Sequence, residues 1–127
     1  MVSVEEDLTR LLNVLREVKP SYKYSYDRVG ELDMLTVDYL HKLELVDLEY
    51  TERNKLATQL RKVRKERRYH KDQVEQLYPL VEFINKNMRQ VKELERVLGE
   101  IRSIEERQSN RMYTPRCMSE NEYYNDK

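Results

Sequence analysis

Residues 56–98, "LATQLRKVRKERRYHKDQVEQLYPLVEFINKNMRQVKELERVL", decide the fold class of this chain. Apolar residues return in this stretch at alternating steps of four and three positions, the spacing of the a and d positions of a coiled coil. A stripe of this length needs another helix to cover it. We call these positions the seam: Leu56, Leu60, Val63, Arg67, His70, Val74, Leu77, Val81, Ile84, Met88, Val91 and Leu98.

Two seam positions are polar, Arg67 and His70, and Glu95 is a third polar residue at the same spacing. Polar groups at such positions commonly fix the register or the oligomeric state of paired helices. In the alternative, the two side chains line a pocket between helices that binds a small anionic ligand such as a nucleotide. A lone histidine brings no second ligand or base, so the sequence favours the register role.

Pro79 interrupts the seam and leaves two architectures open. A proline inside a helix removes a hydrogen bond and costs about 3 kcal/mol. In one architecture Pro79 marks a corner, and helices 50–77 and 80–106 fold back as an antiparallel hairpin that pairs Val74 with Ile84. In the other, the rod is only kinked and the seam packs against a second copy. In both we expect an all-α fold completed by dimerisation.

The N-terminal part predicts two shorter helices. Ser3 and Glu6 have the spacing of a capping box, which predicts a helix over about 4–18 that Pro20 ends. A second helix is expected from Asp33 or Thr36 to a break near 47–50.

Between these helices, Tyr22, Tyr24 and Tyr26 alternate with polar residues. This period of two predicts an extended linker. Its tyrosines would either lie over helix surfaces or form an exposed aromatic row for bases or a partner, and the amphipathic nature of tyrosine favours the first.

The composition fits one helical domain. The chain has 127 residues, 38% of them charged and 39% hydrophobic, with two glycines and three prolines. We expect a single domain over residues 1–110 and an extended or disordered tail over residues 111–127, where the periodicity is lost.

Several classes of protein lack support in this sequence. Cys117 is the single cysteine, and no phosphate-binding, nucleophile-elbow or zinc-protease motif is present, so we expect no enzyme, metal or cofactor. The acidic N-terminus does not resemble a signal peptide, and no apolar run reaches the roughly 20 residues that span a bilayer. A cytoplasmic protein is expected.

The zero net charge hides three blocks. Residues 1–52 carry six Lys/Arg and twelve Asp/Glu, residues 53–76 carry nine and three, and residues 77–127 carry nine of each. The basic block centres on "RKVRKERRYHK", residues 61–71, which is either a solvated helix face neutralised by the acidic block or a binding surface. We name as candidate contact residues Arg61, Arg64, Lys65, Arg68, Tyr69 and Lys71, with Tyr22, Tyr24 and Tyr26.

Residues 31–83 together with "NRMYTPR" at 110–116 resemble short helical proteins encoded by phages and prophages of Gram-positive bacteria. The most specific segments are "RNKLA", "VRKERR" and "NRMYTPR". The resemblance assigns no residue a role, but it implies a bacterial cytoplasm during infection or lysogeny. We therefore expect an interaction protein that binds a protein partner, such as a host or defence nucleic-acid-processing machine. Direct nucleic-acid binding by the basic helix is the alternative.

Overall fold

The computed structural model describes residues 3–125, and this part of the chain contains helices and no strand. The predicted all-α class is therefore confirmed for the described residues. Residues 1–2 of the predicted domain and residues 126–127 of the predicted tail lie outside this part. The helices are α1 (Val4–Leu45), α2 (Tyr50–Lys86), α3 (Met88–Ser109) and the short α4 (Glu120–Asn125).

The first helix begins where the sequence predicts and ends much later. Ser3 Oγ accepts a hydrogen bond from the backbone N–H of Glu6 at 3.1 Å, and so satisfies one of the free donors at the helix start. The predicted end near residue 18 is wrong, because α1 passes through Pro20 and continues to Leu45. Its 42 residues make a rod about 63 Å long.

Packing explains why Pro20 does not end α1. Buried positions recur at helical spacing on both sides of the proline, from Leu12 and Val18 to Ser25 and Leu32. Contacts with α2 and α3 along this stripe outweigh the local cost of one missing hydrogen bond. The extended linker predicted at residues 22–26 is therefore wrong, since these residues are helical.

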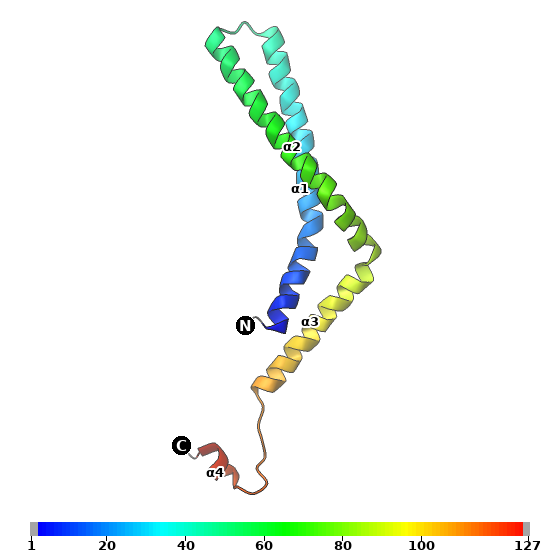
Figure 1. Ribbon diagram of the computed structural model, residues 1–127, viewed down its shortest axis with the longest axis vertical. Helices are drawn as coiled ribbons and strands as arrows, with labels where there is room; N and C mark the ends of the chain where they lie inside the picture. The colour runs from blue at the N-terminus through cyan, green and yellow to red at the C-terminus, as the bar shows by residue number, and fades with distance from the viewer. Residues whose placement is uncertain (1–2, 126–127) are drawn as a thin grey trace.

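The corner of the hairpin lies at residues 46–49, where the sequence predicts a break. From this corner α1 and α2 run back side by side and cross near their middle (Figure 1). Of the two architectures left open at Pro79, the one with a corner there is wrong, because Pro79 lies inside α2. The rod bends instead at Asn87, whose Nδ2 donates to the carbonyl of Phe83 at 2.8 Å at the end of α2.

The seam of α2 and α3 packs against α1 of the same chain, so α2 and α3 do not pair with each other as a hairpin. Six seam residues are buried: Leu56, Val63, His70, Ile84, Val91 and Leu98. The bend at Asn87 turns α3 back along the N-terminal part of α1, where Arg16 pairs with Glu95 at 3.5 Å and Glu5 pairs with Arg102 at 2.9 Å. The resulting core is thin, and among the described residues only Leu12 and Leu32 are less than 2% exposed.

Candidate functional site

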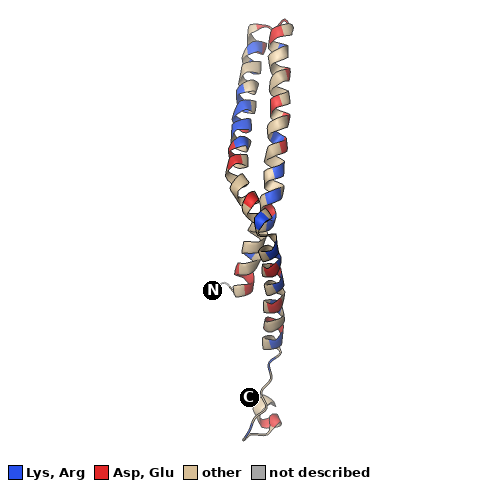
Figure 2. Cartoon of the chain, turned by 90° about the vertical axis from the view of Figure 1, so that its right-hand side faces the viewer, with Lys and Arg blue, Asp and Glu red and all other residues tan. Residues whose placement is uncertain are grey.

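The basic stretch lies on α2, in the half of the hairpin next to the corner (Figure 2). Four of its cations follow Arg61 by three, four, seven and ten positions, and this spacing places all five on one side of the helix. We call them the basic stripe: Arg61, Arg64, Lys65, Arg68 and Lys71. The first four are exposed and Lys71 is half-buried. Ten residues of α-helix give the stripe a length of about 15 Å.

The acidic block reaches this stripe through one carboxylate. Asp33 on α1 pairs with the seam residue Arg67 and lies 3.8 Å from Arg64. Among residues 3–125, the other four cations of the stripe form no ion pair. Because Arg64 and Asp33 are both about half exposed, their attraction is worth ~0–1 kcal/mol. The expected neutralisation of the basic helix by the acidic block is therefore slight.

Glu66, the acid inside the basic stretch, does not neutralise the stripe either. It points toward α1, where the guanidinium of Arg28 donates to it at 3.0 Å and to Glu31 at 3.0 Å. These hydrogen bonds, with the one to Glu31 the stronger cause, raise the pKa of Arg28. The acid is thus paired across the helix contact and leaves the exposed cations with an excess of positive charge.

The structure separates the tyrosines that the sequence groups together. Tyr26 lies with Arg67 and Lys71 along one open hollow between α1 and α2. Tyr24 and Tyr69 lie along a different hollow, and each packs edge-on against His70, with ring centroids 5.6 Å and 5.2 Å away. The nine candidate contact residues therefore do not form one continuous surface.

Tyr22 has a packing role. Its ring stacks on Tyr26 one helical turn later, with centroids 6.1 Å apart, and lies 6.4 Å from the ring of Tyr78 on α2. It is half-buried, whereas Tyr24 and Tyr26 are more than 60% exposed. The covering role expected for the tyrosines thus describes Tyr22, although on a helix and not on a linker.

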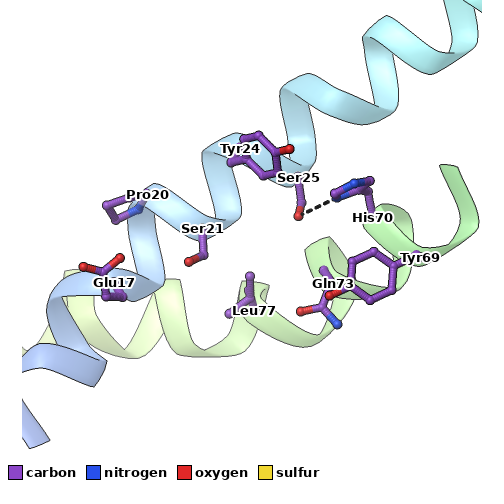
Figure 3. A pocket seen from close by; sticks show the side chains of 9 residues that line it. All are labelled: Glu17, Pro20, Ser21, Tyr24, Ser25, Tyr69, His70, Gln73 and Leu77. Atoms are coloured by element: carbon purple, nitrogen blue, oxygen red, sulfur yellow. Dashed lines mark hydrogen bonds between the residues drawn. The ribbon is translucent and has the colours of Figure 1, made fainter. Parts of the chain in front are cut away.

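The hollow at His70 lies where α1 and α2 face each other beside Pro20, and it has a volume of about 390 Å³ (Figure 3). Ser25 Oγ and His70 Nδ1 are hydrogen-bonded at 3.1 Å, and both residues are buried. His70 Nε2 lies 3.8 Å from a carboxylate oxygen of Glu66. Serine, histidine and glutamate are also the residue types of a hydrolytic triad.

The geometry of this trio does not activate the serine. The distance from Nε2 to Glu66 is longer than a hydrogen bond, and Ser25 is 5% exposed, so a substrate carbonyl would not reach its hydroxyl. Ser25 also lies in the interior of α1, where the backbone N–H groups bond within the helix and none is left to hold an oxyanion. The arrangement fits a buried polar contact between two helices.

Arg67 and His70 do not share a pocket. Arg67 lines the hollow of Tyr26 and His70 lines that of Tyr24 and Tyr69, and the charge of Arg67 is balanced by Asp33. Within residues 3–125, no group of three His, Cys, Asp or Glu side chains is placed to hold a metal ion. No helix in the same part of the chain is both long and apolar enough to cross a membrane.

Comparison of the chain with known protein families, with curated proteins and with solved structures finds no match. The candidate site therefore stands on the charges and distances described above.

Proposed function

We propose that this chain is a non-enzymatic binding protein that uses the basic stripe to bind an acidic surface of a protein partner. The observation that carries the proposal is the row of mostly exposed cations on one side of α2, of which, within residues 3–125, only Arg64 has an ion-pair partner. Charges arranged in this way steer an oppositely charged partner and fix its orientation. The setting that we propose is the bacterial cytoplasm during phage infection or lysogeny, as the sequence resemblance implies.

The limited length of the stripe favours a protein partner over a nucleic acid. About 15 Å of positive helix matches a patch of a few carboxylates, whereas a nucleic acid carries its charge well beyond that length. The chain as a whole is neutral, and α1 carries exposed acids such as Asp38 and Glu44 in the same half of the hairpin. These carboxylates would repel phosphates that extend past the stripe.

Direct nucleic-acid binding is the second candidate, and the position of Tyr26 supports it. Its ring is 62% exposed and lies along the same hollow as Arg67 and Lys71. An aromatic ring beside cations is the combination on which single-stranded bases stack.

Charge reversal tests the first candidate. The triple variant Arg61→Glu/Arg64→Glu/Arg68→Glu should lose the partner captured by the wild-type protein from an extract of the bacterial host. A matched control reverses Arg89, Lys92 and Arg96 on α3, which are exposed and have the same spacing of three and seven positions. The control should keep the partner. Equal capture by the wild-type protein and the stripe variant would refute the proposal.

Salt titration separates the two candidates. Fluorescence anisotropy with a labelled duplex and a labelled single strand measures nucleic-acid binding directly. Affinity that falls steeply with salt and disappears in the stripe variant would establish the second candidate. Flat titration curves at low salt would eliminate it and leave the acidic protein surface as the target.

A further inference from the structure

A second surface of the molecule is apolar and lies away from the basic stripe. It occupies the half of the rod where α3 returns along the start of α1. Its residues on α1, together with Leu80 and Ile104, are 42–68% exposed, and three more on α3 are half-buried. We call this surface the apolar face: Val4, Leu11, Val14, Leu80, Leu94, Val97, Ile101 and Ile104.

The members of the apolar face lie on one side of the helices. Val4, Leu11 and Val14 are spaced by seven and three positions on α1, and the four residues of α3 are spaced by three and four. The ion pairs Arg16–Glu95 and Glu5–Arg102 follow the opposite edge of the contact between these helices. Val14 and Leu80 line one hollow together with Val18 and Leu77, which continues the surface onto α2.

The exposed area of the chain is larger than that of a compact monomer. A protein of 15.6 kDa typically exposes about 7,200 Å², whereas this chain exposes 10624 Å². The excess is more than the roughly 600–1,000 Å² that each partner buries in a stable interface. A rod with so thin a core therefore has enough exposed surface for an interface with another chain.

The net charge of the apolar face indicates which kind of partner it binds. The two helices that carry most of the apolar face have little net charge, since residues 4–21 contain three Lys/Arg and four Asp/Glu and residues 88–109 contain five of each. A surface of this kind meets its own copy without strong repulsion, whereas the basic stripe would repel itself. Neither an acidic nor a basic partner would find a surplus of opposite charge on these two helices.

We propose that the apolar face is the interface of a symmetric homodimer, in which two copies of the three-helix half pack against each other. The buried seam residues take no part in this interface, because α1 covers them, and the seam residue Leu77 borders it in the hollow shared with Leu80. Each basic stripe stays exposed at the far half of its own rod, so the dimer presents two stripes to its partners.

Sedimentation equilibrium of the full chain tests the proposal through two matched variants. Leu11 and Leu40 are both leucines on α1 and are 48% and 47% exposed, but Leu40 lies next to the hairpin corner and outside the apolar face. Leu11→Glu buries two uncompensated charges in a two-fold dimer, and we expect it to raise the dimer Kd by at least about 100-fold. Leu40→Glu should leave the dimer Kd within about 3-fold of the wild-type value.

A second variant, circular dichroism and the salt dependence of the dimer Kd complete the test. Val14→Glu, at a position 62% exposed, repeats the test in case Leu11→Glu fails to fold, and far-UV circular dichroism reports whether each variant is helical. Added salt should preserve or strengthen an apolar dimer, whereas it would weaken one held by ion pairs. A monomeric wild-type protein at micromolar concentrations, a helical Val14→Glu variant that still dimerises, equal dissociation by Leu40→Glu, or a dimer that dissociates in salt would each overturn the proposal.

Discussion

The hydrogen bond between Ser25 and His70 offers a direct test of how the two long helices are paired. It joins α1 to α2 across 45 positions of sequence, with Oγ and Nδ1 3.1 Å apart, and the two residues are 5% and 7% exposed. Ser25→Ala leaves a buried imidazole nitrogen without its partner. A buried polar group that loses its hydrogen bond costs about 1–3 kcal/mol, so we expect this variant to lose stability in that range.

His70→Leu should affect Ser25 less. The serine hydroxyl can turn back to the carbonyl four residues earlier in its own helix, as the hydroxyl of Thr36 does to Leu32 at 2.8 Å. The double variant Ser25→Ala/His70→Leu replaces both partners with apolar groups and removes the unpaired nitrogen. It should therefore be more stable than the sum of the single effects predicts, by about 1 kcal/mol.

The assay is a double-mutant cycle of urea unfolding followed by circular dichroism at one protein concentration, since dimerisation would make stability depend on concentration. If the two residues did not touch, their effects would add to within about 0.3–0.5 kcal/mol. An additive cycle would thus refute the pairing of α1 with α2, and with it the surfaces that this pairing leaves exposed.

Three further predictions concern the core, a helix interior and alkaline pH. Leu32→Ala, at a side chain 1% exposed, should lower the free energy of unfolding by about 3 kcal/mol, whereas Leu40→Ala, at 47%, should lower it by less than about 1 kcal/mol in the same urea titration. Pro20→Ala restores a backbone donor inside α1 and should raise the free energy of unfolding by about 2 kcal/mol; a loss in thermal unfolding would show that the proline geometry is needed for packing. A hydrogen bond to Glu82 raises the pKa of Tyr78, so its stabilising contribution is complete below about pH 10 and is lost as the pH rises through the higher folded value. The free energy of unfolding should therefore depend less on pH above about pH 10 in Tyr78→Phe than in the wild-type protein, and an identical dependence would contradict this linkage.

The regular part of the sequence predicted the helices of residues 56–98, because a sustained apolar repeat at this spacing is typical of packed helices. It did not identify the helix that covers them. The side of α1 that packs on the seam includes Tyr22, Ser25 and Thr36. Because these residues are polar or amphipathic, this side of α1 is not recognised as an apolar repeat in the sequence. Only the structure shows that the packing on this side is continuous from Leu12 to Thr36.

The two prolines misled the sequence prediction for the same physical reason. Pro20 and Pro79 both lie inside long helices, where tertiary contacts on either side compensate for one lost hydrogen bond each. The actual interruption, at Asn87, has a weaker local signal. Asparagine is a common residue at helix ends, and here its side chain bonds the carbonyl of Phe83.

The candidate site was predicted in part. The exposure of the basic stripe could be predicted from the seam. Seam positions face the covering helix, so the cations that lie between them point away from it. An extended segment would place Tyr24 and Tyr26 on the same side, whereas the helix that the structure shows places residues two positions apart on different sides. The serine that bonds His70 gave no signal, as its partner lies 45 positions away.

The geometry of a paired helix also connects the two proposed surfaces. A helix that packs against one neighbour buries a single narrow stripe, so apolar residues flanking that stripe stay partly exposed. In the half of the rod near the corner the flanking positions of α2 are filled by cations, which suit water and an acidic partner. In the half where α3 returns, one edge of the helix contact is flanked by leucine, valine and isoleucine, which favour a further layer of helices. On the two proposals made above, the same packing rule gives the molecule one end for binding a charged partner and another for pairing with its own copy.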